Sequence, residues 1–303
     1  MILGGRGFIG KYLTELLVDD HEVLVVGRAN IKECYSIHGK LVAYQRVSYN
    51  YDEIEGIIRG FNPNAVINLA SKRLSKQQAL LSDYLINLEI ATNLYEACLK
   101  NEILNVVDIS TIGVYGNSKS IPWEENQVTL PENNYSLSKV WIENTSKLYN
   151  SKGMRIKTLR LAQVLGLGER KGYILQLYLE QALKKKQLKV YGPEIGKRHY
   201  VYAKDVSSVI LRVISDDVNP EIFNIGMSEN YSFHQLAKII NEAFDNNSKI
   251  CYSIEKSADL NQYSMSINKA KKLLNWNPMF NLLETYRDIK EEIIKFGYTK
   301  IIQ

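Results

Sequence analysis

Two residues four positions apart, Tyr135 and Lys139, have the types and the spacing of an acid–base pair. Positions i and i+4 of a helix share one face, so the lysine ammonium can lie near the tyrosine ring. A neighbouring cation stabilises a phenolate, which suits a tyrosine to exchange a proton with a substrate hydroxyl. The YxxxK pattern also occurs by chance, so its meaning depends on the residues around it.

A threonine upstream of this pair, Thr111, follows Ser110 and the apolar run Leu104–Ile109. Such a run is typical of a buried strand. The carboxyl ends of strands in a doubly wound sheet face the ligand crevice, so the Thr111 hydroxyl can hydrogen-bond the reacting oxygen. We therefore expect Thr111, Tyr135 and Lys139 to form one catalytic group.

A glycine-rich turn lies near the start of the sequence, before a helical pattern. Glycines spaced GxxGxxG let backbone N–H groups approach a pyrophosphate at a helix N-terminus, and the last glycine permits close packing. The sequence therefore predicts a dinucleotide site formed by Gly4, Gly7, Phe8, Ile9 and Gly10. Because a strand usually has about five or six residues, the short stretch before the turn leads us to expect a natural chain that begins upstream of Met1.

No carboxylate ends the second predicted strand, where Arg28 follows the run Glu22–Val26. An acidic residue at this place usually binds the ribose 2′-hydroxyl of NAD, whereas an arginine can pair with the 2′-phosphate of NADP. We predict NAD or NADP as the cofactor, with Arg28 favouring NADP. The alternative is that Arg28 is a solvated loop residue.

Short apolar runs alternate with helical patterns through the first half of the chain. Runs typical of strands are 22–26, 65–69, 104–109 and 156–161, and patterns typical of helices are 8–18 and 84–99. This alternation predicts right-handed βαβ units. The expected fold class is therefore α/β, with a doubly wound parallel (Rossmann) sheet.

The regular alternation of strand and helix patterns ends after about residue 166, where a smaller mixed α/β lobe is expected. Its predicted elements are helices at 175–188, 232–244 and 269–274, and a strand at 223–225 returns to the first unit. We expect a dinucleotide-binding domain of residues 1–163 plus 198–228. Residues 164–197 plus 229–303 would form the substrate-binding lobe.

Composition and charge exclude several other classes. The 303 residues are 45% hydrophobic and 23% charged with a net charge of +5, ordinary values for a globular protein. The basic residues are scattered, so no nucleic-acid partner is expected. The cysteines and histidines lack ligand spacing, so no metal site is expected. The sequence has neither a run of about 18 apolar residues nor a signal-peptide pattern, so we expect no membrane partner and a cytoplasmic protein.

Taken together, the motifs resemble the NAD-dependent epimerase/dehydratase family of extended short-chain dehydrogenases/reductases. The segments that carry the resemblance follow the family order over almost the whole chain: GGRGFIG (4–10), VINLA (66–70), STIGVYG (110–116), YSLSK (135–139), LRLAQVLGLGER (159–170), RHYVYAKDV (198–206), FNIG (223–226) and LLNWNP (273–278). The resemblance implies an enzyme that interconverts nucleotide-activated sugars through 4-keto intermediates.

The resemblance also implies roles for single residues. Tyr135 would be the general acid–base, Lys139 would hold the nicotinamide ribose, and Thr111 takes the family's Ser/Thr place. Asn87 would have the family's supporting asparagine role, unless it is an ordinary helix-surface amide. Further cofactor contacts would come from Leu69, Ala70 and Ser110.

The substrate contacts implied by the resemblance depart in part from the family pattern. Arg198 matches an arginine that binds the nucleotide phosphates, and Asp259 matches an acid that binds a ribose. Gln163 stands where an asparagine is common, and Lys256 where an arginine is common. A lysine lacks the bidentate phosphate recognition of an arginine, so a looser or shifted pyrophosphate grip is expected.

The residues after Thr111 bear on the reaction. Sugar dehydratases of the family usually have an acidic pair there, whereas this chain has Ile112 and Gly113, so dehydration is not expected. The resemblance leaves an epimerase at C4, favoured as the commoner activity, or an NADPH-dependent 4-ketoreductase or dehydrogenase, favoured by Arg28. A non-catalytic dinucleotide sensor fits less well, because Tyr135 and Lys139 are both present.

The expected partners are a nucleotide-sugar substrate and a second copy of the chain in a homodimer, and the expected setting is polysaccharide biosynthesis.

Overall fold

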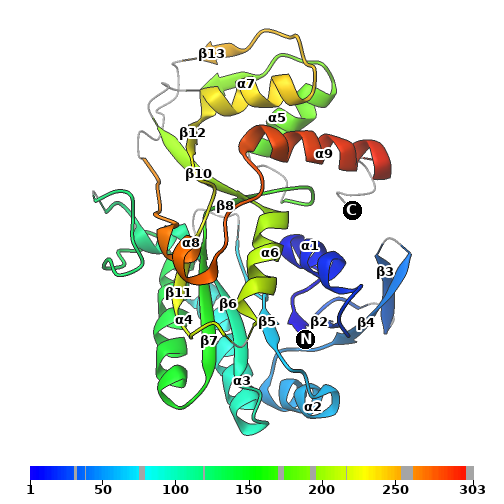
Figure 1. The fold of residues 1–303 in the computed structure, drawn as a ribbon, viewed down its shortest axis with the longest axis vertical. Coiled ribbons are helices and arrows are strands. Elements are labelled where there is room, and N and C mark those ends of the chain that lie inside the picture. The colour runs from blue at the N-terminus through cyan, green and yellow to red at the C-terminus, as the bar shows by residue number, and fades with distance from the viewer. Residues whose placement is uncertain are drawn as a thin grey trace.

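A sheet of eight strands runs through the larger part of the molecule (Figure 1). The computed structural model describes residues 1–30, 33–37, 39–74, 79–118, 120–169, 174–191, 196–215, 217–253 and 262–297. In sheet order the strands are β11 (Ile222–Ile225), β7 (Arg155–Leu161), β6 (Asn105–Thr111), β5 (Val66–Asn68), β1 (Ile2–Leu3), β2 (Leu24–Gly27), β4 (Lys40–Arg46) and β3 (Cys34–Ile37). Neighbouring strands pair in parallel, except for the antiparallel pair of β3 and β4. The predicted α/β class with a doubly wound parallel sheet is confirmed.

Both faces of this sheet are apolar, because successive side chains of a strand point to opposite sides. In β1, Ile2 packs into one apolar cluster and Leu3 into another, and Val25 and Val26 of β2 divide in the same way. Helices α1 (Phe8–Leu17) and α6 (Ala203–Val213) cover the first face. The second face is covered by α2 (Tyr51–Phe61), α3 (Leu85–Lys100) and α4 (Asn134–Ser151).

A second, smaller unit has its own sheets (Figure 1). Its elements also supply most of a separate apolar cluster. Its three-stranded sheet has the order β12 (Asn230–Ser232), β10 (Lys197–Tyr202) and β8 (Gln163–Leu165), and β9 (Lys189–Tyr191) pairs with β13 (Cys251–Ser253). Most of the helical residues in its apolar cluster come from α5 (Ile174–Leu183), α7 (Phe233–Ala243) and α9 (Leu282–Phe296), and Tyr12 of α1 and Ala203 of α6 also belong to it. Because β8 directly follows β7, this unit lies at the carboxyl end of that strand.

The chain crosses between the two units more often than the sequence indicated. Helix α8 (Asn268–Leu274) contacts β11, and Met265, Ala270 and Trp276 are buried in the cluster on the first face of the large sheet. The Trp276 indole N–H donates to Ser208 Oγ on α6 at 2.9 Å. This segment, which the sequence-based division placed in the lobe, therefore packs with the larger unit.

Among the described helices, none combines the length and the apolar content that a bilayer crossing requires.

Candidate active site

The glycine turn that follows β1 has no room for a side chain at Gly4 or at Gly10. Gly4 has a φ of +74°, and a Cβ there would lie 2.8 Å from the backbone N of Ala70. A Cβ on Gly10 would lie 2.4 Å from the carbonyl oxygen of Gly5. The turn therefore packs directly against the segment after β5, and the predicted Leu69 and Ala70 lie beside Gly4.

The start of α1 is suited to an anion. Its N-cap residue is Gly7, which has no side chain to cap the helix, whereas Asn50 caps α2 and Ser232 caps α7. The first N–H groups of a helix lack intrahelical acceptors, and the helix dipole places partial positive charge there. Phe8 and Ile9 form this first turn. The turn and the helix start together fit the pyrophosphate of a dinucleotide.

The catalytic hydroxyl candidate Thr111 is the last residue of β6. Its Oγ1 accepts a hydrogen bond from the Gly113 N–H at 3.2 Å and so caps a 3-10 helix, η2 (Ile112–Tyr115). A Cβ on Gly113 would lie 2.4 Å from Ser136 Oγ on α4. The segment after Thr111 is therefore in contact with the first turn of α4.

Tyr135 and Lys139 lie in the first two turns of α4. The helix begins at Asn134 because the side chain of Asn133 accepts the Ser136 N–H at 2.9 Å. Tyr135 is half-buried and Lys139 is only 3% exposed. The predicted catalytic residues thus come from two elements that contact each other, because α4 packs against β6 on one face of the sheet.

Asn87 is buried inside this region and is not a helix-surface amide. Its Oδ1 accepts from the backbone N–H of Lys72 at 2.6 Å, and its Nδ2 donates to the Lys72 carbonyl at 3.0 Å and to Ser138 Oγ at 3.3 Å. Ser138 Oγ in turn donates to the Tyr135 carbonyl at 2.7 Å. The side chain therefore ties the loop after β5 to the helix that carries Tyr135 and Lys139.

Two residues near the tyrosine ring were not identified from the sequence. The guanidinium of Arg73 lies 5.4 Å from the centroid of the Tyr135 ring, and the Tyr84 ring centroid lies 6.0 Å from it. Arg73 follows β5 by a few residues, and Tyr84 ends a 3-10 helix, η1 (Leu81–Tyr84). Both lie between β5 and α3, a stretch in which no periodic pattern marks a functional side chain.

Glu169 is a further acid in this region. It lines a small cavity with Gly166 and Gly168, in a loop held where the Leu167 N–H donates to Tyr12 Oη at 2.8 Å. Burial raises the pKa of Glu169 to about 7, although the charge of Arg73 opposes the rise. The sequence motif included Glu169 but gave it no role.

The remaining cofactor candidates have distinct surroundings. Arg28 is exposed just after β2, with its guanidinium 5.9 Å from the Tyr49 ring centroid. Ser110 is buried, and its hydroxyl donates to Glu143 on α4 at 2.5 Å. The Ser110 side chain is therefore directed to the protein interior, so a cofactor contact there would involve its backbone.

Of the predicted substrate-binding residues, the structure describes Gln163 and Arg198. Gln163 begins β8 and is paired in register with Tyr200 of the neighbouring β10, which also carries Arg198. The Arg198 guanidinium lies 4.3 Å from the ring centroid of Tyr263 and 5.7 Å from that of Phe233. Two other predicted contacts lie outside the described residues, namely Lys256 and Asp259.

The part of the chain that the structure describes contains no group of three or more His, Cys, Asp or Glu side chains that could hold a metal ion. The three cysteines are free thiols, and burial raises the pKa of Cys98 to about 12.

These features share one edge of the sheet. The glycine turn follows β1, Leu69 and Ala70 follow β5, and Thr111 ends β6, and these three strands are neighbours. The carboxyl edge of a doubly wound parallel sheet is where dinucleotides bind. The arrangement can hold a nicotinamide beside a tyrosine that exchanges protons.

Known proteins resemble this chain over nearly its whole length. UDP-N-acetylglucosamine 4-epimerase from Bacillus cereus is 28% identical, with a TM-score of 0.85 over 96% of this chain and 98% of that one. UDP-glucose 4-epimerase from Thermus thermophilus, solved in complex with NAD, is 26% identical, with a TM-score of 0.79 over 96% and 98%. The dTDP-4-dehydro-6-deoxyglucose reductase of Escherichia coli is 27% identical over 92% of each chain.

The model of the NAD dependent epimerase/dehydratase family matches residues 1–226. This match confirms the predicted family, the predicted enzyme class and the predicted nicotinamide cofactor. The solved relatives place the chain among enzymes with the Rossmann-type fold. The chain belongs to the NAD dependent epimerase/dehydratase family, whose members include nucleotide-sugar epimerases and reductases.

Proposed function

We propose that this enzyme is a nucleotide-sugar 4-epimerase that retains its NAD through the catalytic cycle, and that UDP-N-acetylglucosamine is the first substrate to test. The proposal depends on one observation. Thr111 at the end of β6 adjoins the helix with Tyr135 and Lys139, and the next residues, Ile112 and Gly113, cannot act as acid or base. The likeness to the B. cereus UDP-N-acetylglucosamine 4-epimerase supports the choice of substrate.

The cofactor would lie along the carboxyl edge of the sheet. The backbone N–H groups that begin α1 would bind its pyrophosphate, and the absence of side chains at Gly4 and Gly7 gives the phosphates access to the backbone. Asn87 would support the cofactor site indirectly, because it holds the loop that carries Lys72 against α4. When bound, NAD would supply reversible hydride transfer at the sugar C4.

The proton of the same oxidation would be handled by the protein. Tyr135 would take the proton of the C4 hydroxyl as the hydride leaves, and would give it back when the keto group is reduced from the other face. Lys139, one helical turn along, would hold the nicotinamide ribose beside Tyr135, the role that the family pattern gives it. The Thr111 hydroxyl would donate a hydrogen bond to the reacting oxygen, which stabilises the charge that develops there.

The nucleotide would be held by the smaller unit. The Arg198 guanidinium lies near two aromatic rings, those of Tyr263 and Phe233. A guanidinium would bind phosphate oxygens through two parallel hydrogen bonds. Gln163 lies on the adjacent strand. We include Lys256 and Asp259 in the proposed nucleotide site on the family pattern alone.

The two units would divide the work. Residues 1–163 plus 198–228 would bind the cofactor, and residues 164–197 plus 229–303 would bind the sugar nucleotide, apart from the segment around α8 that packs with the larger unit.

Two measurements on the purified protein test the function. Mass spectrometry of the nucleotide released on denaturation identifies the cofactor, and chromatography or NMR follows the conversion of UDP-N-acetylglucosamine into its C4 epimer. Retained NAD and interconversion without added cofactor support the proposal, and Tyr135→Phe should abolish the interconversion. Full turnover by Tyr135→Phe would overturn the acid–base assignment.

A second candidate, an NADPH-dependent 4-ketoreductase, is favoured by Arg28, an exposed cation directly after β2. The likeness to the E. coli dTDP-4-dehydro-6-deoxyglucose reductase supports it. A protein purified without nucleotide that oxidises NADPH stoichiometrically with a 4-keto nucleotide sugar, and that does not interconvert epimers, would replace the first proposal with this one.

A further inference from the structure

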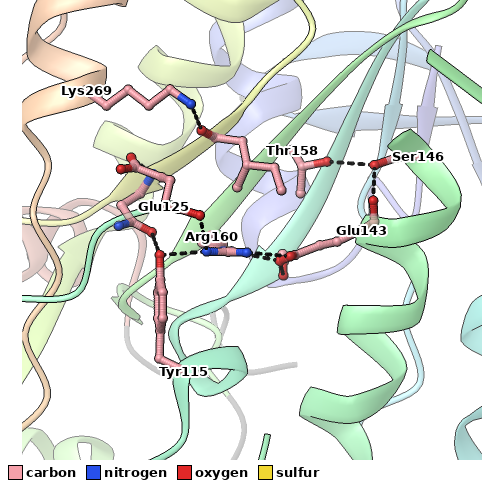
Figure 2. Close-up of polar contacts among 10 residues, drawn as sticks. Tyr115, Glu125, Glu143, Ser146, Thr158, Arg160 and Lys269 are labelled. Carbon is pink, nitrogen blue, oxygen red and sulfur yellow. Dashed lines mark hydrogen bonds and ion pairs between the residues drawn. The ribbon is translucent and has the colours of Figure 1, made fainter. Parts of the chain in front are cut away.

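A buried acid lies on the same face of α4 as the two proposed catalytic residues. Tyr135, Lys139 and Glu143 follow one another at intervals of four residues, so they share one side of the helix. Glu143 is 2% exposed and points from α4 toward Arg160 of β7, which is also 2% exposed (Figure 2). The two form an ion pair in the protein interior.

One end of this ion pair holds the residue before Thr111. Glu143 accepts two hydrogen bonds from Arg160, from Nε at 3.0 Å and from Nη2 at 2.7 Å. It also accepts the hydroxyl of Ser110 at 2.5 Å. Ser110 and Thr111 are the last two residues of β6, so the contact fixes the end of this strand against the catalytic face of α4.

The other end of the pair holds the segment after Thr111. Arg160 Nη1 donates to Tyr115 Oη at 2.7 Å and to the Glu125 carbonyl at 3.3 Å (Figure 2). Tyr115 is the last residue of η2, the helix that Thr111 caps, and its hydroxyl donates to Asn224 Oδ1 at 2.7 Å. The segment 110–115 is therefore held at both ends by one ion pair.

We propose that the Glu143–Arg160 pair is a positioning device that clamps the segment 110–115 and so fixes Thr111 against Tyr135 and Lys139. Apolar contacts already pack the elements together: Ile142 of α4, Val106 of β6 and Ile156 of β7 belong to one cluster. Apolar contacts do not fix the relative orientation of the elements. The geometry of a bidentate arginine–carboxylate pair does fix it. The inference depends on the role of Thr111 in the proposed function.

Two single hydroxyl deletions test the clamp while leaving the ion pair intact. Ser110→Ala removes the bond at one end, and Tyr115→Phe removes the bond at the other together with the Tyr115 bond to Asn224. The matched control is Ser146→Ala, because the hydroxyl of the buried Ser146 donates to the backbone carbonyl of Glu143 at 2.8 Å and lies 3.5 Å from the Thr158 hydroxyl, two partners that lie outside the segment 110–115 (Figure 2).

Hydrogen-exchange mass spectrometry measures how firmly the segment 110–115 is held, and it needs no substrate. Exchange in peptides that cover residues 111–116 should become about tenfold faster in Ser110→Ala and Tyr115→Phe, and should be unchanged in Ser146→Ala. Unchanged exchange in both clamp variants would overturn the inference. A rise of equal size in Ser146→Ala would also do so, because it would mean general loosening.

A double-mutant cycle connects the clamp to catalysis. Ser110→Ala should lower kcat for UDP-N-acetylglucosamine about tenfold with little change in KM, and the effect should vanish in a Thr111→Ala background. Additive effects of the two substitutions would show that Ser110 does not act through Thr111. Absence of turnover in the unchanged enzyme would reject the proposed function, while the exchange measurement would still decide on the clamp.

Discussion

Gly113 and Ser136 are so close that a Cβ on the glycine would lie 2.4 Å from the serine hydroxyl oxygen. Gly113 is two residues after Thr111, and Ser136 is the neighbour of Tyr135. This contact sets how closely the two parts of the proposed catalytic group approach each other. A side chain at position 113 would separate them.

Gly113→Ala is therefore expected to lower kcat at least tenfold while cofactor binding changes little, because the glycine turn after β1 is not in contact with the substitution. Single-turnover assays and NAD titration check this. The control is Gly56→Ala in α2, where no atom lies within 4 Å of the new Cβ. It should keep full activity and gain up to about 1 kcal/mol of stability, as expected for glycine replaced in a helix interior. Equal activity of the two variants would contradict the argument.

Asn87→Ala should weaken NAD binding and lower the free energy of unfolding by about 1–3 kcal/mol, because it leaves the backbone N–H and carbonyl of Lys72 without their side-chain partner. Urea unfolding and NAD titration measure the two effects. Asn93→Ala is the control on the same helix. Its amide donates to the Tyr49 carbonyl at 3.0 Å, so stability should fall while NAD affinity stays the same. NAD affinity that is unaltered in Asn87→Ala would remove Asn87 from the support of the site.

Arg28→Glu should reduce the affinity for NADP relative to NAD by at least tenfold, which corresponds to about 1.4 kcal/mol. The substitution replaces an exposed cation after β2 with a charge that repels a 2′-phosphate. Titration of each dinucleotide gives the ratio. Arg59→Ala on α2, an exposed arginine paired with Glu55, should leave the ratio unchanged. A ratio that is equally unchanged in Arg28→Glu would make Arg28 a solvated loop residue.

Glu169 should make the stability of the protein fall as pH rises. Its pKa is raised from 4.5 to about 7 in the folded state, so between these values the folded protein binds more protons than the unfolded chain. Stability is therefore greatest below about pH 4.5 for this group and is lost as pH rises to about 7, by about 1–3 kcal/mol. Urea unfolding at pH 5 and pH 8 should show that Glu169→Gln lacks this part of the decline. Parallel profiles for the two proteins would exclude the raised pKa.

Variants of the Glu143–Arg160 ion pair allow its effect on stability to be measured apart from its effect on kcat. Glu143→Gln alone should destabilise the fold by about 3–5 kcal/mol, because it leaves the buried Arg160 charge without its partner. The double variant Glu143→Leu, Arg160→Met should recover most of that loss and still have kcat at least tenfold below the unchanged enzyme. Unfolding curves and kcat for the three proteins test this. A double variant with full activity would mean that packing alone positions Thr111.

The fold was predictable where strands are buried on both faces. The runs 104–109 and 156–161 became β6 and β7, whose apolar residues pack on both sides of the sheet. By contrast, β3 and β4 at the edge were missed, because their exposed positions alternate with few buried ones and resemble a polar loop. Helix α9 was also missed, although its signals are present in the sequence: Asn281 and Glu284 form a capping box, and the buried residues recur at helical spacing, namely Leu282, Tyr286, Ile289 and Ile293.

The site was predictable where function depends on local spacing. Tyr135 and Lys139 are one helical turn apart, and the glycine turn is a continuous segment, so both motifs are visible in the sequence. Arg73 and Arg160 reach the site only through tertiary contacts, Arg73 with the Tyr135 ring and Arg160 with Glu143. No period in the sequence connects such partners, and Glu143 looks like any polar residue of a helix.

The place of β11 at the end of the large sheet has a consequence for any attempt to shorten this enzyme. β11 hydrogen-bonds to β7 along Ile222–Ile225, and α6 covers the face on which α1 lies. A fragment that stopped near residue 163 would contain the glycine turn, Tyr135 and Lys139, yet it would leave the polar backbone of β7 open to other chains. Exposed strand edges of this kind promote aggregation. The unit that contains the large sheet is thus a discontinuous piece of the polypeptide, because its end strand β11 follows strands of the smaller unit in the sequence.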